Sequence, residues 1–310
     1  MKPSSTSRMS CELMWAILIV TSSILITSPM RSDAADWTEG IFLYIANNHL
    51  YEARADGRGD AVALLSPSEF GDVKGVTLNG LTCGRGSDVL FFVTTIDFAR
   101  PTDKPKSRIF SFDTKSKRLT PIAQESSVAI GWPALSGDGQ RIAALAIGYG
   151  SPDALVIANL RTNSFKRYEI ERVGAPRSWG PKDGEVFATA LGRDARSWQI
   201  IAVDPSSGKS RVVADGGIPV TLNSRGLLAY LSVDQKALVV SQLSSGTPIA
   251  KFSGFYKDLA QWLDDDTVLF VSGVGYEDYL GTASLKSKKT SVVLRPARGE
   301  IKGACWIPKR

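Results

Sequence analysis

The chain has 310 residues, of which 43% are hydrophobic and 22% are charged, as in an ordinary globular protein. This composition excludes a low-complexity or disordered chain. The formal net charge of +6 favours acidic partners but is too small to indicate nucleic-acid binding.

The N-terminal segment has the three parts of a secretory signal peptide. A basic start precedes an apolar run at residues 14–26 (MWAILIVTSSILI), and Ser32-Asp33-Ala34 places small residues before a cleavage point. The alternative is a retained membrane anchor, but the run is shorter than the ~20 residues that a span needs. We therefore expect a cleaved signal peptide at residues 1–34. Residues 35–310 are then a periplasmic or secreted domain, without stable membrane insertion.

Two cysteines remain in the exported domain, Cys83 and Cys305. Cys11 lies before the apolar run and so cannot be the acylated cysteine of a lipoprotein. An exported pair is either a disulfide or two separate buried thiols. Spacing alone does not show whether the two Cα atoms come within bonding range.

Six copies of one pattern follow the signal peptide, each a pair of alternating strands joined by a tight polar turn. The turns centre near Asp56, Thr114, Arg161, Asp204, Leu243 and Leu285. Their spacing of about 40 to 58 residues suits a four-stranded blade, and two further short strands lie between successive pairs. The pattern predicts an all-β fold: a six-bladed β-propeller with four antiparallel strands per blade. A β-sandwich is the alternative, and it does not predict a regular period.

The predicted strands at the two ends of the domain can belong to one blade. Residues 40–47 (GIFLYIAN) open the domain on a second strand, and residues 301–308 (IKGACWIP) form a lone strand at its end. We expect the C-terminal strand to join the N-terminal blade and close the ring, because this removes an unpaired edge.

One turn carries a family resemblance. Residues 135–143 (LSGDGQRIA) are close to the W-S-P-D-G-K-R-I-A consensus of TolB-like six-bladed β-propellers, which have WD40-like repeats, and partial copies start at Trp179, Trp262 and Trp306. The resemblance implies the fold and an exported location. Tol-system proteins also carry an N-terminal α/β domain, for which we expect no counterpart, so a Tol-Pal role is not implied.

Catalytic signals are weak. The only histidine, His49, lies in a short turn, and one histidine with two cysteines does not make a zinc site. Asp264, Asp265 and Asp266 offer oxygen ligands for calcium, but they occupy a tight turn. The tryptophans at Trp132, Trp262 and Trp306 recur at blade positions and are predicted to pack in the core. We predict no catalytic residue, no metal and no cofactor.

Charge is unevenly divided between the two predicted faces. Loops between second and third strands, and loops that join blades, emerge together on what we call the long-loop face, whose longest loop is residues 95–108. Basic and aromatic residues gather there, as on recognition surfaces. The predicted binding residues are Arg100, Lys104, Lys106, Arg177, Trp179, Arg193, Arg196, Trp198, Tyr256 and Tyr276. The alternative is an ordinary solvated rim.

The sequence therefore favours a monomeric, exported, non-catalytic binding or scaffold propeller. Its predicted partner is a protein or an acidic envelope polymer, docked on the long-loop face. The alternative is a lactonase-like hydrolase or lyase with a metal-assisted site in the central channel.

The signal-peptide prediction can be tested directly. Protein recovered outside the cytoplasm should begin near Ala35, because the small residues before it form the cleavage site. N-terminal sequencing that found Met1 or an intact apolar run would show a retained anchor instead.

Overall fold

The structure is a computed structural model that describes most of the exported domain. The described residues are 36–70, 76–83, 88–95, 106–122, 129–147, 153–162, 164–192, 197–217, 222–275, 277–296 and 299–308. The predicted signal peptide lies outside them. Residues Asp33–Arg310 form one compact unit. Within the described ranges, no helix is both long enough and apolar enough to cross a membrane.

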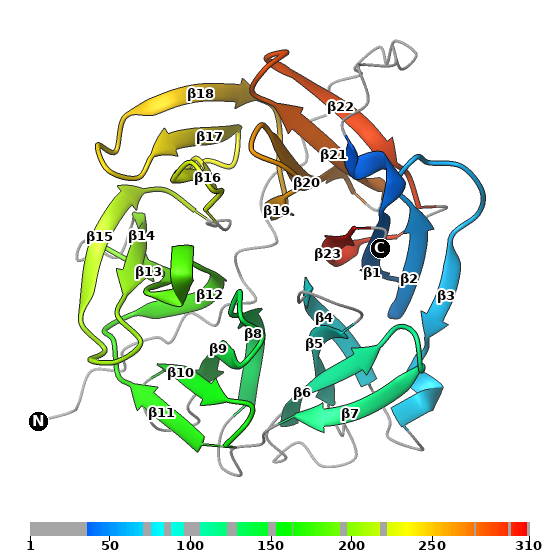
Figure 1. Cartoon of the computed structure of the whole chain (residues 1–310), viewed down its shortest axis with the longest axis horizontal. Coiled ribbons are helices and arrows are strands. Elements are labelled where there is room, and N and C mark those ends of the chain that lie inside the picture. Colours follow the sequence, from blue (N-terminus) through cyan, green and yellow to red (C-terminus); the bar gives the residue numbers. More distant parts are fainter. Residues whose placement is uncertain are drawn as a thin grey trace, which may run out of the picture. The chain divides into compact units, whose positions relative to one another are not determined.

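The described residues form six antiparallel sheets, arranged around a central axis as in a β-propeller (Figure 1). The first contains β23 (Ile301–Ile307), β1 (Ile41–Ala46), β2 (His49–Arg54) and β3 (Val62–Leu65). The second contains β4 (Val76–Cys83), β5 (Asp88–Thr95), β6 (Lys106–Asp113) and β7 (Arg118–Ile122). The third contains β8 (Ala129–Leu135), β9 (Arg141–Ile147), β10 (Ala154–Asn159) and β11 (Ser164–Tyr168).

The fourth sheet contains β12 (Val173–Trp179), β13 (Val186–Leu191), β14 (Trp198–Val203) and β15 (Ser210–Asp215). The fifth contains β16 (Leu227–Leu231), β17 (Ala237–Gln242) and β18 (Pro248–Ser253). The sixth contains β19 (Asp258–Trp262), β20 (Thr267–Val274), β21 (Glu277–Ser284) and β22 (Lys289–Leu294). Short 3₁₀ helices lie at η2 (Asp36–Glu39), η3 (Pro67–Phe70) and η4 (Pro181–Asp183).

The prediction of six four-stranded blades holds for five sheets only. The sheet of β16–β18 has three strands among the described residues. Residues 218–221, which precede its first strand, lie outside the described ranges. The described neighbours of that gap contact β16, because the amide of Gly217 donates to Leu231 O and the amide of Asn223 donates to Leu227 O.

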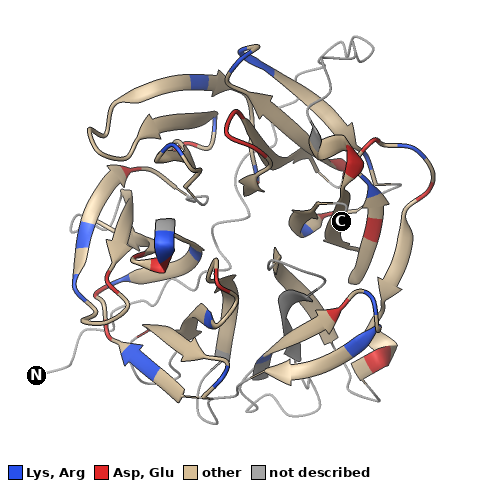
Figure 2. Ribbon diagram, in the orientation of Figure 1, with Lys and Arg blue, Asp and Glu red and all other residues tan. Residues whose placement is uncertain are grey.

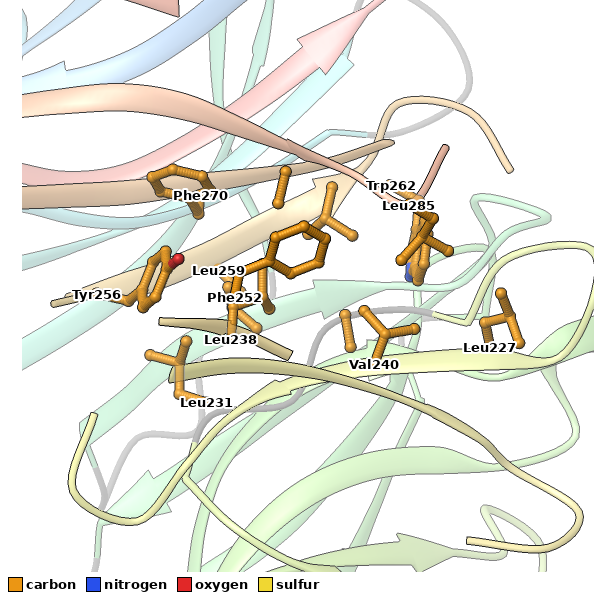
Figure 3. Packing of buried hydrophobic residues seen from close by; sticks show 13 residues of the cluster. Leu227, Leu231, Leu238, Val240, Phe252, Tyr256, Leu259, Trp262, Phe270 and Leu285 are labelled. Atoms are coloured by element: carbon orange, nitrogen blue, oxygen red, sulfur yellow. The ribbon is translucent and has the colours of Figure 1, made fainter. Parts of the chain in front are cut away.

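The hydrophobic core lies between neighbouring sheets. Strands such as β13, β17 and β20 are buried over almost their whole length, because both of their faces are covered. One interface packs Leu238 and Val240 of β17 against Trp262 of β19 and Phe270 of β20 (Figure 3). Such two-sided burial explains the continuous apolar runs in the sequence.

The outermost strands are exposed and carry basic residues (Figure 2). Arg118, Lys166, Arg211, Lys251 and Lys289 lie on β7, β11, β15, β18 and β22 and are all exposed. Charged side chains on an edge strand oppose pairing with another chain. Part of the positive charge of the described residues therefore lies on sheet edges.

The C-terminal strand completes the first sheet. β23 pairs antiparallel with β1, with Ile307 opposite Ile41 and Ala304 opposite Tyr44. This is the pairing expected from the two ends of the sequence. A disulfide between Cys83 of β4 and Cys305 of β23, with Cα atoms 5.8 Å apart, then joins the first two sheets.

Loss of the disulfide should destabilise the domain without preventing its folding. The bond links residues separated by 222 positions, so it strongly restricts the unfolded chain, whereas the β23–β1 ladder remains in its absence. The double variant Cys83→Ser/Cys305→Ser should lose roughly 2–5 kcal/mol of unfolding free energy in guanidinium titrations. A reductant should lower the unfolding free energy of the wild type to that of the double variant, and should leave the unfolding free energy of the double variant unchanged. Equal stability of the two proteins would contradict this.

Candidate functional site

A cavity of about 990 Å³ lies on the axis of the propeller. It is lined by the innermost strands β4, β8, β12, β19 and β23, and by the turns that follow several of them. Volumes of this size hold small ligands or a short chain segment. We call this space the axial cavity; its turns connect first to second strands and so do not belong to the long-loop face.

Irregular inner strands shape the axial cavity. The ladders of β4, β8, β12 and β19 with their neighbours each contain a register shift, as does the ladder of β23 with β1. At two of these shifts, Gly80 and Trp132 adopt φ values of 52°. Bulges of this kind bend a strand and redirect its side chains, and they are common beside binding sites.

The described carboxylates of the axial cavity are all engaged in local bonds. Asp183 accepts from the amides of Gly137 at 2.6 Å and Asp138 at 3.0 Å, which ties the third and fourth sheets together. Asp138 accepts from the Ser136 hydroxyl and the Gln140 amide. These two bonds, the hydroxyl contributing most, hold the pKa of Asp138 below its ordinary value. These hydrogen bonds hold the turns of the cavity in place.

One ion pair crosses the axial cavity. Arg177 of β12 contacts Asp258 of β19 at 3.3 Å, and each side chain is 22% exposed. Asp258 also accepts from the amide of Leu259. Arg177 lies at a register shift of β12, which turns its side chain toward the axis.

Three polar atoms in the lining of the axial cavity are buried without a hydrogen-bond partner. They are Nε of Arg177, Oγ of Ser178 and Nε1 of Trp262. Ser178 is 5% exposed and Trp262 is 8% exposed. Each of these atoms is closed off from solvent, so the donors lie within the packed wall and not at the surface of the cavity.

The tryptophans of the repeats differ in their surroundings. Trp179 is buried, donates to Ala134 O at 2.8 Å, and packs below the guanidinium of Arg141. Trp262 is also buried, as predicted for the core. Trp132 and Trp306 are only partly buried and line the axial cavity, so they keep surface that a ligand can contact.

Three predicted binding residues do not lie on an open surface. Arg177 lies in the axial cavity rather than on the long-loop face. Trp179 and Tyr256 are buried, because packing between sheets covers them. Tyr256 stacks edge-on against Phe270 with centroids 4.9 Å apart, and burial raises the pKa of its hydroxyl to about 12. Trp179 and Tyr256 are therefore not exposed as predicted, and Arg177 belongs to a different surface from the predicted one.

Of the other predicted binding residues, the structure describes two. Trp198 begins β14 and is partly buried, and Lys106 begins β6. The remaining predictions lie outside the described residues: Arg100, Lys104, Arg193, Arg196 and Tyr276.

Three exposed apolar side chains occupy the described part of the long-loop face. Val233 is 49% exposed, Phe255 is 52% exposed and Val274 is 82% exposed. Val233 lies between β16 and β17, Phe255 between β18 and β19, and Val274 at the end of β20. We call these three residues the apolar patch.

Hydrogen bonds hold the three segments of the apolar patch against one another. The amide of Tyr256 donates to Gln235 O, and the hydroxyl of Ser272 donates to Phe255 O. Phe255 is an aromatic residue in a loop that joins two blades, which is the kind of residue expected on this face. The two valines were missed, although Val274 stands out as an apolar residue between Gly273 and Gly275.

The described residues contain no group of three or more His, Cys, Asp or Glu side chains placed to hold a metal ion. In the turn considered for calcium, Asp264 accepts from the amide of Asp266 and the hydroxyl of Thr267, and Asp266 pairs with Arg225 at 2.6 Å. These carboxylates thus bond within the turn and to the neighbouring sheet.

Comparison with known proteins gives the fold but no family assignment. No protein-family model and no curated protein matches the sequence. TolB from Acinetobacter baumannii is similar in structure, with a TM-score of 0.70, 16% identity, and coverage of 88% of this chain and 67% of that one. The fold is that of a TolB-like β-propeller.

Two further solved structures extend this comparison. A putative TolB from Agrobacterium tumefaciens has a TM-score of 0.62 and 10% identity, and the match covers 87% of this chain and 98% of that one. Puromycin hydrolase has a TM-score of 0.56 and 16% identity, and the match covers 82% of this chain but only 42% of the hydrolase. A protein named as an enzyme is thus among the similar structures.

The turn at Asp138 should contribute to stability in a pH-dependent way. The pKa of the Asp138 carboxyl is lowered in the folded state. The carboxylate therefore contributes its full stabilisation above the ordinary pKa of a carboxyl, and this contribution is lost as the pH falls through the folded-state pKa. Asp138→Asn should lower the melting temperature by about 2 °C at pH 7, since the group is largely exposed. The difference in melting temperature between the variant and the wild type should shrink as the pH falls below about 4. A difference that stays constant over this range would show that the charge of Asp138 is not involved.

Proposed function

We propose that the chain is an exported, non-catalytic binding or scaffold propeller that docks a protein partner on its long-loop face. The observation that carries the proposal is the apolar patch of Val233, Phe255 and Val274. Exposed apolar side chains are common singly, but here an aromatic and two aliphatic side chains lie on segments that hydrogen-bond to one another, which favours a docking surface.

The surroundings of the apolar patch favour a protein over an acidic polymer. Asp234 and Lys236 are both exposed beside Val233, so both signs of charge border the patch. An apolar centre with a mixed polar rim is the arrangement of protein interfaces. A polyanion would instead be recognised by a surface dominated by cations. The basic loop at residues 95–108 remains a predicted extension of this face.

Two observations bear on location and catalysis. The N-terminal pattern of a signal peptide supports export, and two of the similar structures are named TolB or putative TolB. Similarity to puromycin hydrolase keeps an enzymatic role as the alternative. Binding is favoured because Asp138, Asp183 and Asp258 are held by local bonds in the axial cavity.

We also infer a closed ring of six blades. Its support is the β23–β1 ladder at one junction. At the incomplete sheet, the support is the pair of hydrogen bonds that Gly217 and Asn223 make to β16.

Site-specific photo-crosslinking tests the docking surface. A photoreactive phenylalanine analogue at Phe255 should give a discrete crosslinked product with one protein in cells that export the full chain. The same analogue at Val62, which is 60% exposed on the edge strand β3, is the matched control and should not give that product. Val274→Asp should reduce the product, because a charge in an apolar contact is unfavourable.

The outcomes separate the alternatives. A product specific to position 255, identified by mass spectrometry and reduced by Val274→Asp, supports the proposal. Equal products at both positions, crosslinking only to a second copy of the chain, or capture of a polysaccharide alone would overturn it.

A further inference from the structure

The side chain of Lys257 joins two of the segments that carry the apolar patch. Lys257 follows Phe255 by two residues, in the segment that leads into β19. Its Nζ atom donates to the carbonyl oxygen of Gly275, the residue after Val274, at 3.0 Å, and also to Asp278 of β21. One ammonium group therefore connects the Phe255 loop to the hairpin of β20 and β21.

The tip of that hairpin has little restraint of its own. β20 ends at Val274 and β21 begins at Glu277, so Val274 lies at the tip, where it is 82% exposed and gains little order from packing. Gly273 precedes it, and Gly275, with a φ of 63°, follows it. Glycine loses more conformational freedom on ordering than any other residue. The position of Val274 therefore depends on bonds from outside the tip.

The group that supplies those bonds is buried, although the patch is exposed. The side chain of Asp278 is 0% exposed and that of Lys257 is 15% exposed. The second carboxylate oxygen of Asp278 accepts from the amide of Ile301, the first residue of β23, at 2.8 Å. Two side chains thus connect the apolar patch to the strand that completes the first sheet.

A buried ion pair is better suited to fix a geometry than to add stability. The cost of removing two charges from water offsets much of their attraction, and apolar residues of similar volume often stabilise a fold equally well. Hydrogen bonds from an ammonium group, by contrast, set the distance and direction of their acceptors. An apolar side chain in place of Lys257 would fill the same space without holding the carbonyl group of Gly275.

We propose that Lys257 is a positioning residue of the docking surface. It holds the hairpin tip that carries Val274 in a fixed position relative to Phe255. The proposal deepens the docking function and rests on it, but the restraint on the hairpin tip can be measured without a partner.

Backbone order at the hairpin tip tests this restraint in the purified exported protein. In the wild type, ¹⁵N relaxation should give the amide of Val274 an order parameter of about 0.85, the value of rigid backbone. In Lys257→Met/Asp278→Asn, which leaves neither charge buried alone, it should fall below about 0.6. The matched control is Arg211→Met/Glu185→Gln, which removes an ion pair of 2.8 Å at the fourth sheet and should leave the order parameter of Val274 unchanged.

Photo-crosslinking from position 255 tests the consequence for docking. Lys257→Met/Asp278→Asn should reduce the yield of the crosslinked product at least about threefold, because the surface is no longer preorganised. The control pair of variants should retain the yield.

Thermal melts separate a positioning role from a structural one. A lower melting temperature of Lys257→Met/Asp278→Asn, with the order parameter of Val274 or the crosslink yield unchanged, would show that the ion pair serves the fold alone and would overturn the proposal. A wild-type order parameter below about 0.6 would overturn it as well, even if the double variant does not fold. Absence of any crosslink in the wild type would instead contradict the docking function, whereas the relaxation data still decide whether Lys257 restrains the hairpin.

Discussion

Apolar packing between neighbouring sheets is the interaction on which the rest of this structure depends. No single sheet has a core of its own, because its middle strands are covered only when a sheet lies on each side. The interface between the fifth and sixth sheets shows this, with Val240 and Phe252 on one side and Trp262 and Phe270 on the other. Hydrogen bonds between sheets, such as the one that the amide of Gly137 donates to Asp183, then hold neighbouring turns together.

The innermost strands are irregular where they approach the axis. Register shifts in β4, β8, β12 and β19 bend these strands and redirect their side chains. The shift in β12 brings Arg177 to the axis, where it meets Asp258 of a distant strand. The axial cavity is thus a consequence of how the sheets meet, and it does not arise within any one repeat.

Charge on this domain has two separate uses. Exposed cations such as Lys166 and Lys251 lie on edge strands, where they discourage pairing with other chains. Inside, Lys257 is largely buried and pairs with Asp278, whose other oxygen accepts from the amide of Ile301 and so anchors the start of β23. A count of basic residues along the sequence does not separate these two uses, because a lysine on an edge strand and a lysine in a buried ion pair both occur in polar segments of the sequence.

The sequence by itself determined the all-β class, the repeating four-strand pattern and the pairing of residues 301–307 with residues 41–46, because strand alternation and Asp-Gly turn chemistry are local. It did not decide whether Cys83 and Cys305 are joined, since that depends on two inner strands from different sheets coming within 5.8 Å. Nor did it place Arg177 and Tyr256 correctly: a register shift and inter-sheet packing direct their side chains. Tertiary structure decided the candidate site because its residues come from several sheets, and their meeting at the axis is set by the packing of whole sheets.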